Sequence, residues 1–257
     1  MTSRPVGTDS DHRLRLAQKD WHKWGLPLAA EPEIITQVSG GLTNRGYRLA
    51  SPELDGDLLL RINHPTPSAL GIQRSREREI IRKTAELGIG RPFLYWDPDE
   101  QYAVFPWLDA RTWTETDFAC AGQRRRLFNV LGQLKDVELP YPRRSYLSYA
   151  EHYWRQLEET GLADPALSRR WHSIQPRLRA FDQKEWRACL VHHDLIPSNV
   201  LETAEQIYVI DWEYAAPGHP EIDLWTIESD RVSEPFIPEL MDWINTLWAR
   251  LAKAHPQ

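Results

Sequence analysis

The pattern of apolar positions changes soon after the start of the chain. Residues 9–26 place apolar side chains at helical spacing, which predicts an amphipathic helix. The segments 34–39, 45–50 and 57–63 are instead typical of strands, and an Asp-Gly turn at residues 55–56 joins the last two. The chain is therefore expected to begin with one helix and then to enter a strand-rich region.

This strand-rich region is predicted to contain one further helix and a second hairpin. Ser68 is a candidate N-cap for a helix that runs to Leu87 and is ended by Gly88. The segments 93–97 and 101–108 predict the hairpin, because a Pro-Asp turn separates two runs rich in apolar and aromatic residues.

From Thr114 onward the pattern is mainly helical. The apolar residues between 118 and 134 fit the helical period. Asp164 followed by Pro165 is typical of a helix start, with a capping carboxylate ahead of a first-turn proline. The other expected elements are short strands at 188–192 and 207–211, and helices beginning at Glu221 and at Pro235.

A strand-rich half followed by a helix-rich half predicts an α+β fold with two lobes. The N-terminal lobe would carry an antiparallel sheet with a helix, and the C-terminal lobe would be mainly helical. We place the first lobe at residues 1–108, the second at 109–257 and a hinge at about 105–111. A length of 257 residues suits two such lobes that share a cleft.

Composition narrows the class of protein. The net charge of −6 argues against nonspecific binding to nucleic acid, which needs a basic surface. No apolar run approaches the ~20 residues that cross a bilayer, and the polar N-terminus lacks a signal-peptide pattern. Cys120 and Cys189 have neither disulfide nor metal-ligand spacing, which indicates a reducing compartment. We therefore expect a cytoplasmic protein without nucleic-acid or membrane partners.

One constellation of residues carries candidate chemistry. An apolar strand leads into His192-His193-Asp194, Asn199 follows five residues after Asp194, and Asp211 ends the next strand. Phosphoryl transfer needs such a set, because one carboxylate accepts the hydroxyl proton while an amide oxygen and a second carboxylate hold Mg²⁺ against the phosphates. A single aspartate here would be an ordinary turn residue. The three together predict Asp194 as the catalytic carboxylate, with Asn199 and Asp211 as the metal ligands.

The same residues resemble a known family. His-x-Asp-Leu-x-x-x-Asn followed by Ile-Asp-Trp-Glu-Tyr is similar to choline/ethanolamine kinases, bacterial thiamine kinases and aminoglycoside phosphotransferases. The resemblance runs from Val38 to about Trp225. It implies a protein-kinase-like fold, ATP and Mg²⁺ as cofactors, and a small-molecule hydroxyl as phosphoryl acceptor. The N-terminal lobe would then bind the nucleotide, and the helical lobe would supply the catalytic loop and the acceptor site.

The resemblance also assigns the nucleotide site in the first lobe. The segment 38–47 looks like a phosphate-covering loop, in which Gly40, Gly41 and Asn44 would approach the phosphates. Arg61 occupies the strand position that contacts the α- and β-phosphates, where its planar fork suits bidentate binding.

The remaining nucleotide-site assignments concern an ion pair and the hinge. Glu77 on the following helix would pair with the phosphate-binding arginine, and Glu79 is the competing candidate. The adenine would bond to backbone atoms around Phe105 to Trp107. An Asp-Ala pair follows the hinge, where the family usually has an acidic-Gly or similar pair.

In the second lobe, the resemblance gives His192 and Asp223 structural roles beside the catalytic loop. Trp212, Glu213 and Trp225 are candidates for the acceptor site, and Glu213 would otherwise assist the metal. Aromatic and acidic groups suit a cationic ligand, although most of the 12 tryptophans and 9 tyrosines are expected to be core residues. Further aromatic candidates are Tyr149, Tyr153, Trp154 and Trp243.

The acceptor is the open question. The motifs look closest to bacterial choline kinases and nearly as close to thiamine kinases, and both substrates pair a primary hydroxyl with a fixed cation. Aminoglycosides rank third, because the C-terminal part is short for so large a pocket. An alternative of another class is a regulatory protein that binds nucleotide without turnover, but the intact Asp194, Asn199 and Asp211 set favours an enzyme.

Overall fold

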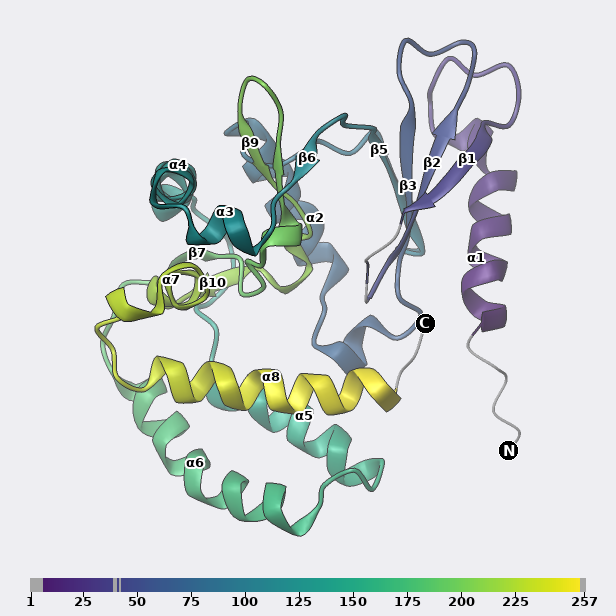
Figure 1. Cartoon of the computed structure of the whole chain (residues 1–257). Coiled ribbons are helices and arrows are strands. Elements are labelled where there is room, and N and C mark those ends of the chain that lie inside the picture. The colour runs from purple at the N-terminus through teal and green to yellow at the C-terminus, as the bar shows by residue number, and fades with distance from the viewer. Residues whose placement is uncertain (1–6, 39–40, 42, 255–257) are drawn as a thin grey trace. The chain divides into compact units, whose positions relative to one another are not determined.

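The computed structural model describes residues 7–38, 41 and 43–254, which divide into two compact units (Figure 1). The first unit comprises the chain up to Pro67 together with Arg91–Asp109. The second comprises Ser68–Gly90 together with the chain from Ala110 onward. Residues 68–90 thus cluster with the second unit, although they precede the lobe boundary that the sequence suggests at residue 108. Within the described residues, no helix is long and apolar enough to cross a membrane.

The first unit is built on a five-stranded antiparallel sheet with the strand order β1-β2-β3-β5-β4. Strands β2 and β3 match the expected segments closely, and a bulge interrupts β1 between Ile34 and Thr36. The strand bounds are β1 Glu33–Val38, β2 Arg45–Ala50, β3 Leu58–Ile62, β4 Tyr95–Trp96 and β5 Tyr102–Pro106.

One face of this sheet is covered by the first helix. Leu58, Leu60 and Ile62 alternate with less buried residues along β3, and they pack in a core that also contains Ala17 of α1 (Gly7–Lys19). This alternation places Arg61 on the other face of β3. The helix is shorter than expected from the sequence, because the chain tightens into a 3-10 turn at Trp21–Lys23 after Lys19.

The second unit begins with a helix that starts later than expected. Helix α2 spans Arg74–Glu86, so Ser68 is not its N-cap. The reason is Gly71, whose φ of +73° breaks a continuous helix, and a Cβ at this position would lie 2.9 Å from the ring of Tyr149. Gly88 follows the helix with a φ of +72°, as the sequence predicts for its C-terminal end.

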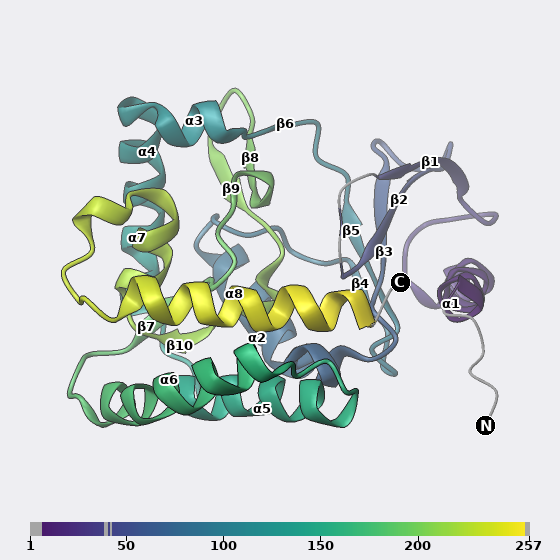
Figure 2. The same ribbon diagram turned by 60° about the horizontal axis from the view of Figure 1, so that its bottom comes forward.

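The rest of the second unit holds two small sheets and the remaining helices (Figure 2). The strands are β6 Arg111–Thr112, β7 Cys189–Val191, β8 Val200–Glu202, β9 Ile207–Val209 and β10 Ala216–Gly218, with the sheet orders β6-β8-β9 and β10-β7. The helices are α3 Glu115–Ala119, α4 Ala121–Gly132, α5 Tyr146–Glu159, α6 Pro165–Gln183, α7 Glu221–Ile227 and α8 Ile237–Ala254.

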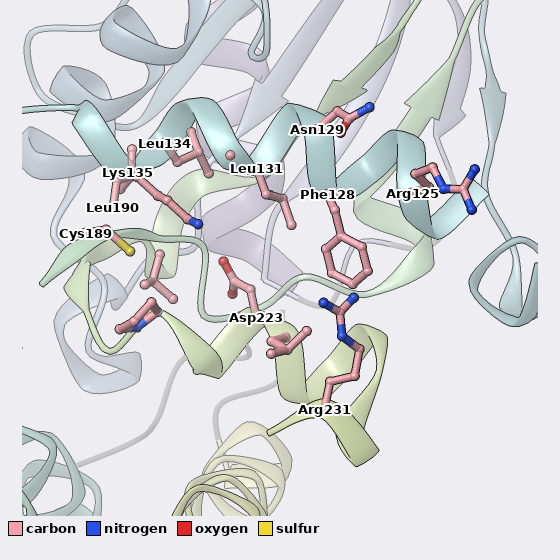
Figure 3. A pocket seen from close by; sticks show the side chains of 14 residues that line it. Arg125, Phe128, Asn129, Leu131, Leu134, Lys135, Cys189, Leu190, Asp223 and Arg231 are labelled. Carbon is pink, nitrogen blue, oxygen red and sulfur yellow. The ribbon is translucent and has the colours of Figure 1, made fainter. Parts of the chain in front are cut away.

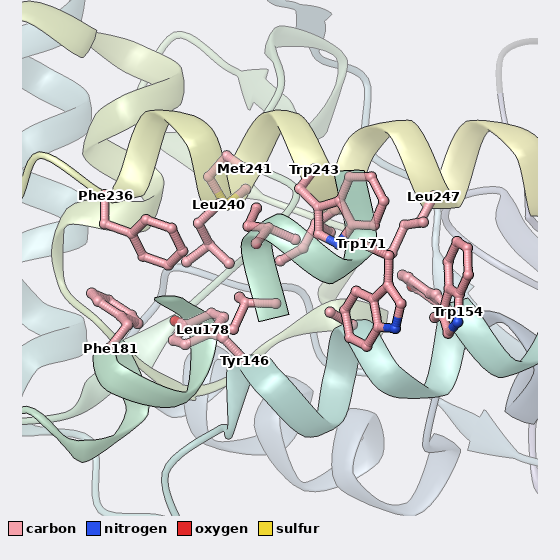
Figure 4. Packing of buried hydrophobic residues seen from close by; sticks show 14 of the residues in the cluster. Tyr146, Trp154, Trp171, Leu178, Phe181, Phe236, Leu240, Met241, Trp243 and Leu247 are labelled. Atoms are coloured by element: carbon pink, nitrogen blue, oxygen red, sulfur yellow. The ribbon is translucent and has the colours of Figure 1, made fainter. Parts of the chain in front are cut away.

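The main core of this unit lies among α5, α6 and α8 (Figure 4). Trp154, Trp171 and Trp243 contribute one indole from each helix, and their ring centroids lie 5.5 to 6.4 Å apart. The first and last of these tryptophans are therefore core residues and not groove-lining ones. Helix α6 begins as expected, since the Asp164 carboxylate accepts a hydrogen bond of 2.8 Å from the N–H of Leu167.

Candidate active site

The loop that carries Asp194 is held by a buried carboxylate. After the apolar strand β7, His193 adopts a φ of +67°, which is uncommon for a residue with a side chain. Asp223 accepts hydrogen bonds of 2.8 Å from the N–H of His192 and 3.0 Å from that of His193. Two backbone donors on one carboxylate stabilise this conformation, so Asp223 orients the segment that ends in Asp194.

His192 is fully buried beside this loop and acts as a spacer. Its Nε2–H donates to the carbonyl of Ile210 at 2.9 Å, and its Nδ1 accepts from the N–H of Asp194 at 3.3 Å. Burial lowers the pKa of His192, which favours the neutral ring that these two bonds require. The ring links the loop that carries Asp194 to the segment before Asp211, and these two bonds occupy both of its nitrogens.

Asp194 and Asn199 are joined directly. The amide nitrogen of Asn199 donates to the backbone oxygen of Asp194 at 2.8 Å and to its Oδ2 at 3.3 Å. This contact orients the amide so that Oδ1 of Asn199 is the atom a cation would use. Burial, then the negative charge of Glu213, raises the pKa of Asp194 to about 6, while the bond from Asn199 opposes the shift. The carboxylate is therefore ionised at neutral pH and is a stronger base than an exposed aspartate.

Asp211 follows the strand β9 in a left-handed conformation, with φ 63° and ψ 60°. Aspartate tolerates this region better than most residues. The N–H of Ile210 donates to the carbonyl of Asn199 at 2.9 Å, so the backbones that carry Asn199 and Asp211 are adjacent. A carboxylate and an amide oxygen from neighbouring backbones form a hard-oxygen donor set that fits Mg²⁺.

A buried ion cluster lies next to these residues. Nη1 of Arg74 donates to Oε2 of Glu77 at 2.7 Å and to Oε2 of Glu213 at 2.9 Å, and the three side chains are at most 1% exposed. The cluster thus joins α2 to the segment that follows Asp211. Glu79 instead contacts Arg82 on the partly exposed side of the helix. Of the two glutamates considered from the sequence, Glu77 is the one directed into the interior.

Arg74 was not among the site residues predicted from the sequence, although the sequence contained a signal for it. Arg74 and Glu77 have the i, i+3 spacing of facing side chains on a helix. Its second partner, Glu213, lies 139 residues away and could not be inferred from spacing. The predicted pairing of Arg61 with Glu77 joins residues of different units and stays a prediction.

Two of the aromatic and acidic acceptor candidates are interior residues. Trp212 is 2% exposed, and its indole N–H donates to the carbonyl of Val209 at 2.9 Å. Its ring packs on His192 with centroids 4.8 Å apart. Glu213 takes part in the ion cluster described above. Trp225 is half-buried and packs against the core of α5, α6 and α8.

In the first unit, Arg61 is held on the sheet face opposite to α1. Its Nε donates to Oδ1 of Asn63 at 3.1 Å, and its guanidinium carbon lies 5.4 Å from the ring centroid of Trp96 and 5.5 Å from that of Phe105. Aromatic rings on which a guanidinium stacks restrict its orientation, as a phosphate contact requires. At Trp107, the backbone N–H already donates to the carbonyl of Asp57 at 2.8 Å.

The loop before β2 is only partly described. Gly40 lies outside the described residues. A Cβ on Gly41 would lie 2.3 Å from the carbonyl oxygen of Asn44, so only glycine fits this close backbone approach. The side chain of Asn44 is buried. The phosphate contacts predicted for these residues stay predictions.

The cavity found in the second unit lies elsewhere. It measures about 420 Å³ and is walled by α4, β7 and the start of α7, with Asp223 at its inner side (Figure 3). Asp194, Asn199 and Asp211 are not among the residues that line it. The cavity therefore adjoins Asp223, which holds the loop that carries Asp194, and it is not lined by the candidate reacting groups.

Comparison with known proteins identifies the family. A sequence profile described as "Phosphotransferase enzyme family" matches residues 34–253, which is most of the chain. The chain belongs to this phosphotransferase family. A curated relative, a LicA homolog from Mycoplasma capricolum, is 26% identical over 110 residues, and the match spans 42% of this chain and less than half (44%) of that protein.

Solved structures of other phosphotransferases share the fold. Choline kinase LicA from Streptococcus pneumoniae is 19% identical with a TM-score of 0.71, over 96% of this chain and 92% of that one. An ethanolamine kinase from Plasmodium vivax is 16% identical with a TM-score of 0.69, over 93% and 75%. A macrolide 2'-phosphotransferase from Brachybacterium faecium is 21% identical with a TM-score of 0.52, over 96% and 86%. This member of the phosphotransferase enzyme family thus has the α+β, protein-kinase-like fold expected from the sequence.

Proposed function

We propose that this phosphotransferase transfers the γ-phosphoryl group of ATP, with Mg²⁺, to the hydroxyl of a small molecule. The observation that carries the proposal is the joined arrangement of Asp194, Asn199 and Asp211. The amide of Asn199 is fixed by Asp194 through its nitrogen, and its backbone is bonded to the residue before Asp211. This arrangement, in which a basic carboxylate lies beside two adjacent backbones with hard-oxygen side chains, supports a role in phosphoryl transfer.

Asp194 is the proton acceptor in this proposal. The acceptor hydroxyl loses its proton to a carboxylate oxygen of Asp194 as its oxygen bonds to phosphorus and the bond to the leaving ADP oxygen breaks. A pKa of about 6 keeps the carboxylate ionised at neutral pH and brings its basicity closer to the working pH. Asp223 and His192 hold the loop, so the carboxylate needs little reorganisation before it accepts the proton.

Asn199 and Asp211 would hold the metal, and Mg²⁺ would supply charge neutralisation on the phosphate oxygens. In the first unit, Arg61 would contact the α- and β-phosphates, and Gly41 with Asn44 would form part of the loop over them. Backbone atoms between Phe105 and Trp107 would meet the adenine. Because the N–H of Trp107 is used by Asp57, other backbone groups of this segment must serve that contact.

Choline is the first acceptor to test and thiamine the second. The motifs resemble those of choline and thiamine kinases, and the names of the similar proteins include choline kinase LicA and a LicA homolog.

The test is a transfer assay with γ-labelled ATP and a panel of choline, ethanolamine, thiamine, amino sugars and kanamycin-like compounds. We expect labelled product with at least one alcohol, dependent on Mg²⁺ and absent in Asp194→Asn. Asp230→Asn, at an exposed aspartate of the same unit, is the matched control and should retain activity. Nucleotide binding without transfer to any alcohol would instead favour a regulatory protein.

A further inference from the structure

A buried arginine lies close to the loop that carries Asp194, and no carboxylate among the described residues forms an ion pair with it. Arg144 is only 9% exposed and lies two residues before the start of α5. Its backbone N–H donates to the carbonyl of Pro217, and its Nη2 donates to the carbonyl of Tyr214, both at 2.7 Å. Its guanidinium carbon lies 4.4 Å from the ring centroid of Tyr149. Backbone anchors and an aromatic ring therefore fix both ends of this side chain.

The other terminal nitrogen of this guanidinium is unused. Nη1 of Arg144 is buried and has no hydrogen-bond partner in the part of the chain that the structure describes. A buried donor normally finds a partner, and a buried charge is normally paired. Bracing the Tyr214 carbonyl needs a single donor, so it does not account for an arginine with a second, unsatisfied amino group. The side chain is prepared to bind a further group.

A second arginine adds to the positive charge. Arg76, in the first turn of α2, has a buried Nε without a partner among the described residues, and its Nη1 bonds to the neutral side chain of Gln73. Burial, then the positive charge of Arg144, lowers the pKa of Arg76 to about 10. Two guanidinium groups thus repel each other, and none of the ion pairs found among the described residues neutralises either of them.

This arginine pair lies on the side of the catalytic carboxylate. Tyr214, whose carbonyl Arg144 binds, is three residues after Asp211. The backbone bond from Arg144 to Pro217 also ties it to β10, which pairs with β7, the strand that leads into His193 and Asp194. Two residues after Arg144, the hydroxyl of Tyr146 lies 3.1 Å from Nε2 of His193. A ligand on the arginines would therefore be close to the proton acceptor.

We propose that Arg144 and Arg76 bind an anionic group, a carboxylate or a phosphate, of the hydroxyl acceptor. Arg144 would donate through Nη1, and Tyr149 positions its guanidinium. The hydroxyl of Tyr149 is 2.5 Å from that of Tyr153, which donates to the carbonyl of Leu70, so the Tyr149 proton is already used. The inference rests on the proposed phosphotransfer and gives the acceptor a charge opposite to that of choline.

The residues expected to bind a cation are buried, which supports the same conclusion. A fixed cation would need exposed acidic and aromatic groups. Glu213 is instead buried in an ion pair with Arg74, and Trp212 is interior. A quaternary ammonium placed next to Arg144 and Arg76 would meet two like charges, whereas an anion would relieve their repulsion.

The test compares alcohols that differ mainly in charge. We would measure kcat/KM for 3-hydroxypropanoate against 1,3-propanediol, for glycerol 3-phosphate against glycerol, and for choline. At least one anionic alcohol should exceed its neutral counterpart by about 10-fold or more, because charge-assisted bonds are the stronger ones. The carboxylate and phosphate arms decide which anion the site takes. In Arg144→Gln and Arg76→Gln this preference should be lost because the KM for the anionic alcohol rises. The kcat/KM for the neutral alcohols should change by less than about threefold.

Two further measurements, a control variant and a binding titration, test the anion site. Arg143→Gln is the matched control, since the neighbouring Arg143 is exposed, binds the carbonyl of Lys184 and should leave the preference intact. Calorimetric titration of 3-hydroxypropanoate and glycerol 3-phosphate without ATP tests binding apart from turnover. Binding that Arg144→Gln abolishes, without any transfer, would support the anion site and reject the proposed function. The inference would be overturned if the enzyme used choline or neutral alcohols and both arginine variants left that transfer unchanged. It would also be overturned if neither anion bound or accepted a phosphoryl group.

Discussion

Replacing Arg74 with methionine tests the buried ion cluster. The variant keeps most of the side-chain volume and removes the cation that both Glu77 and Glu213 contact, at 2.7 and 2.9 Å. Because all three side chains are at most 1% exposed, water cannot replace the lost charge. Breaking a buried pair from one side costs about 3–5 kcal/mol, and here two carboxylates lose this partner. We expect the free energy of unfolding to fall by at least the lower end of that range.

The assay is equilibrium unfolding in urea, followed by circular dichroism, together with thermal unfolding. A loss of about 3–5 kcal/mol corresponds to a melting temperature lower by about 6–20 °C in a chain of this size. Adding Glu213→Gln to Arg74→Met should restore part of the stability, because it removes one of the two buried carboxylates that have lost their cation.

The matched control is Arg82→Met on the same helix. Arg82 is 57% exposed and contacts Glu79 and Glu86, so its loss should cost less than about 1 kcal/mol. If Arg74→Met were no less stable than this control, the cluster would not hold α2 to the segment after Asp211. If Glu213→Gln restored no stability to Arg74→Met, lost packing and not uncompensated charge would explain the effect.

The other predictions concern catalysis. Asp194→Asn should lower kcat by at least ~10²-fold with little change in nucleotide affinity, measured by single-turnover transfer and nucleotide titration. Because Asp194 acts as the carboxylate, kcat/KM should rise with pH through about 6, and Glu213→Gln should move this limb to lower pH by removing a negative charge. If Glu213→Gln did not move the pH at which kcat/KM rises, a group other than Asp194 would control that rise. Asp211→Asn should abolish Mg²⁺-dependent transfer without lowering the melting temperature, and wild-type turnover at matched Mg²⁺ would reject the metal assignment. Arg61→Ala should raise the KM for ATP more than that for the acceptor, and an unchanged ATP KM would remove Arg61 from the site.

Local patterns predicted much of this fold. The strand expected at 45–50 is β2 with the same bounds, and Asp164 caps α6 as a carboxylate before proline should. The spacing of Asp194, Asn199 and Asp211 could be read from the sequence because strand, loop and strand succeed one another within a short segment. Features of this kind depend on neighbours in the chain.

Features that depend on distant contacts could not be predicted. Helix α2 starts after Gly71 and not at Ser68, because the chain turns in a left-handed conformation against Tyr149. A sequence pattern shows that a glycine is present but not which ring it meets. The burial of Glu213 has the same origin, since its partner Arg74 is 139 residues away.

The stack of Trp154, Trp171 and Trp243 has a spectroscopic consequence. Indoles within 5.5 to 6.4 Å of one another, at angles of 13° to 30°, are close enough for their electronic transitions to couple. The three rings come from three different helices of the second unit, so the coupling exists only when those helices are packed. The near-ultraviolet circular dichroism of this chain therefore contains a signal for tertiary packing of the helical unit, without any added label.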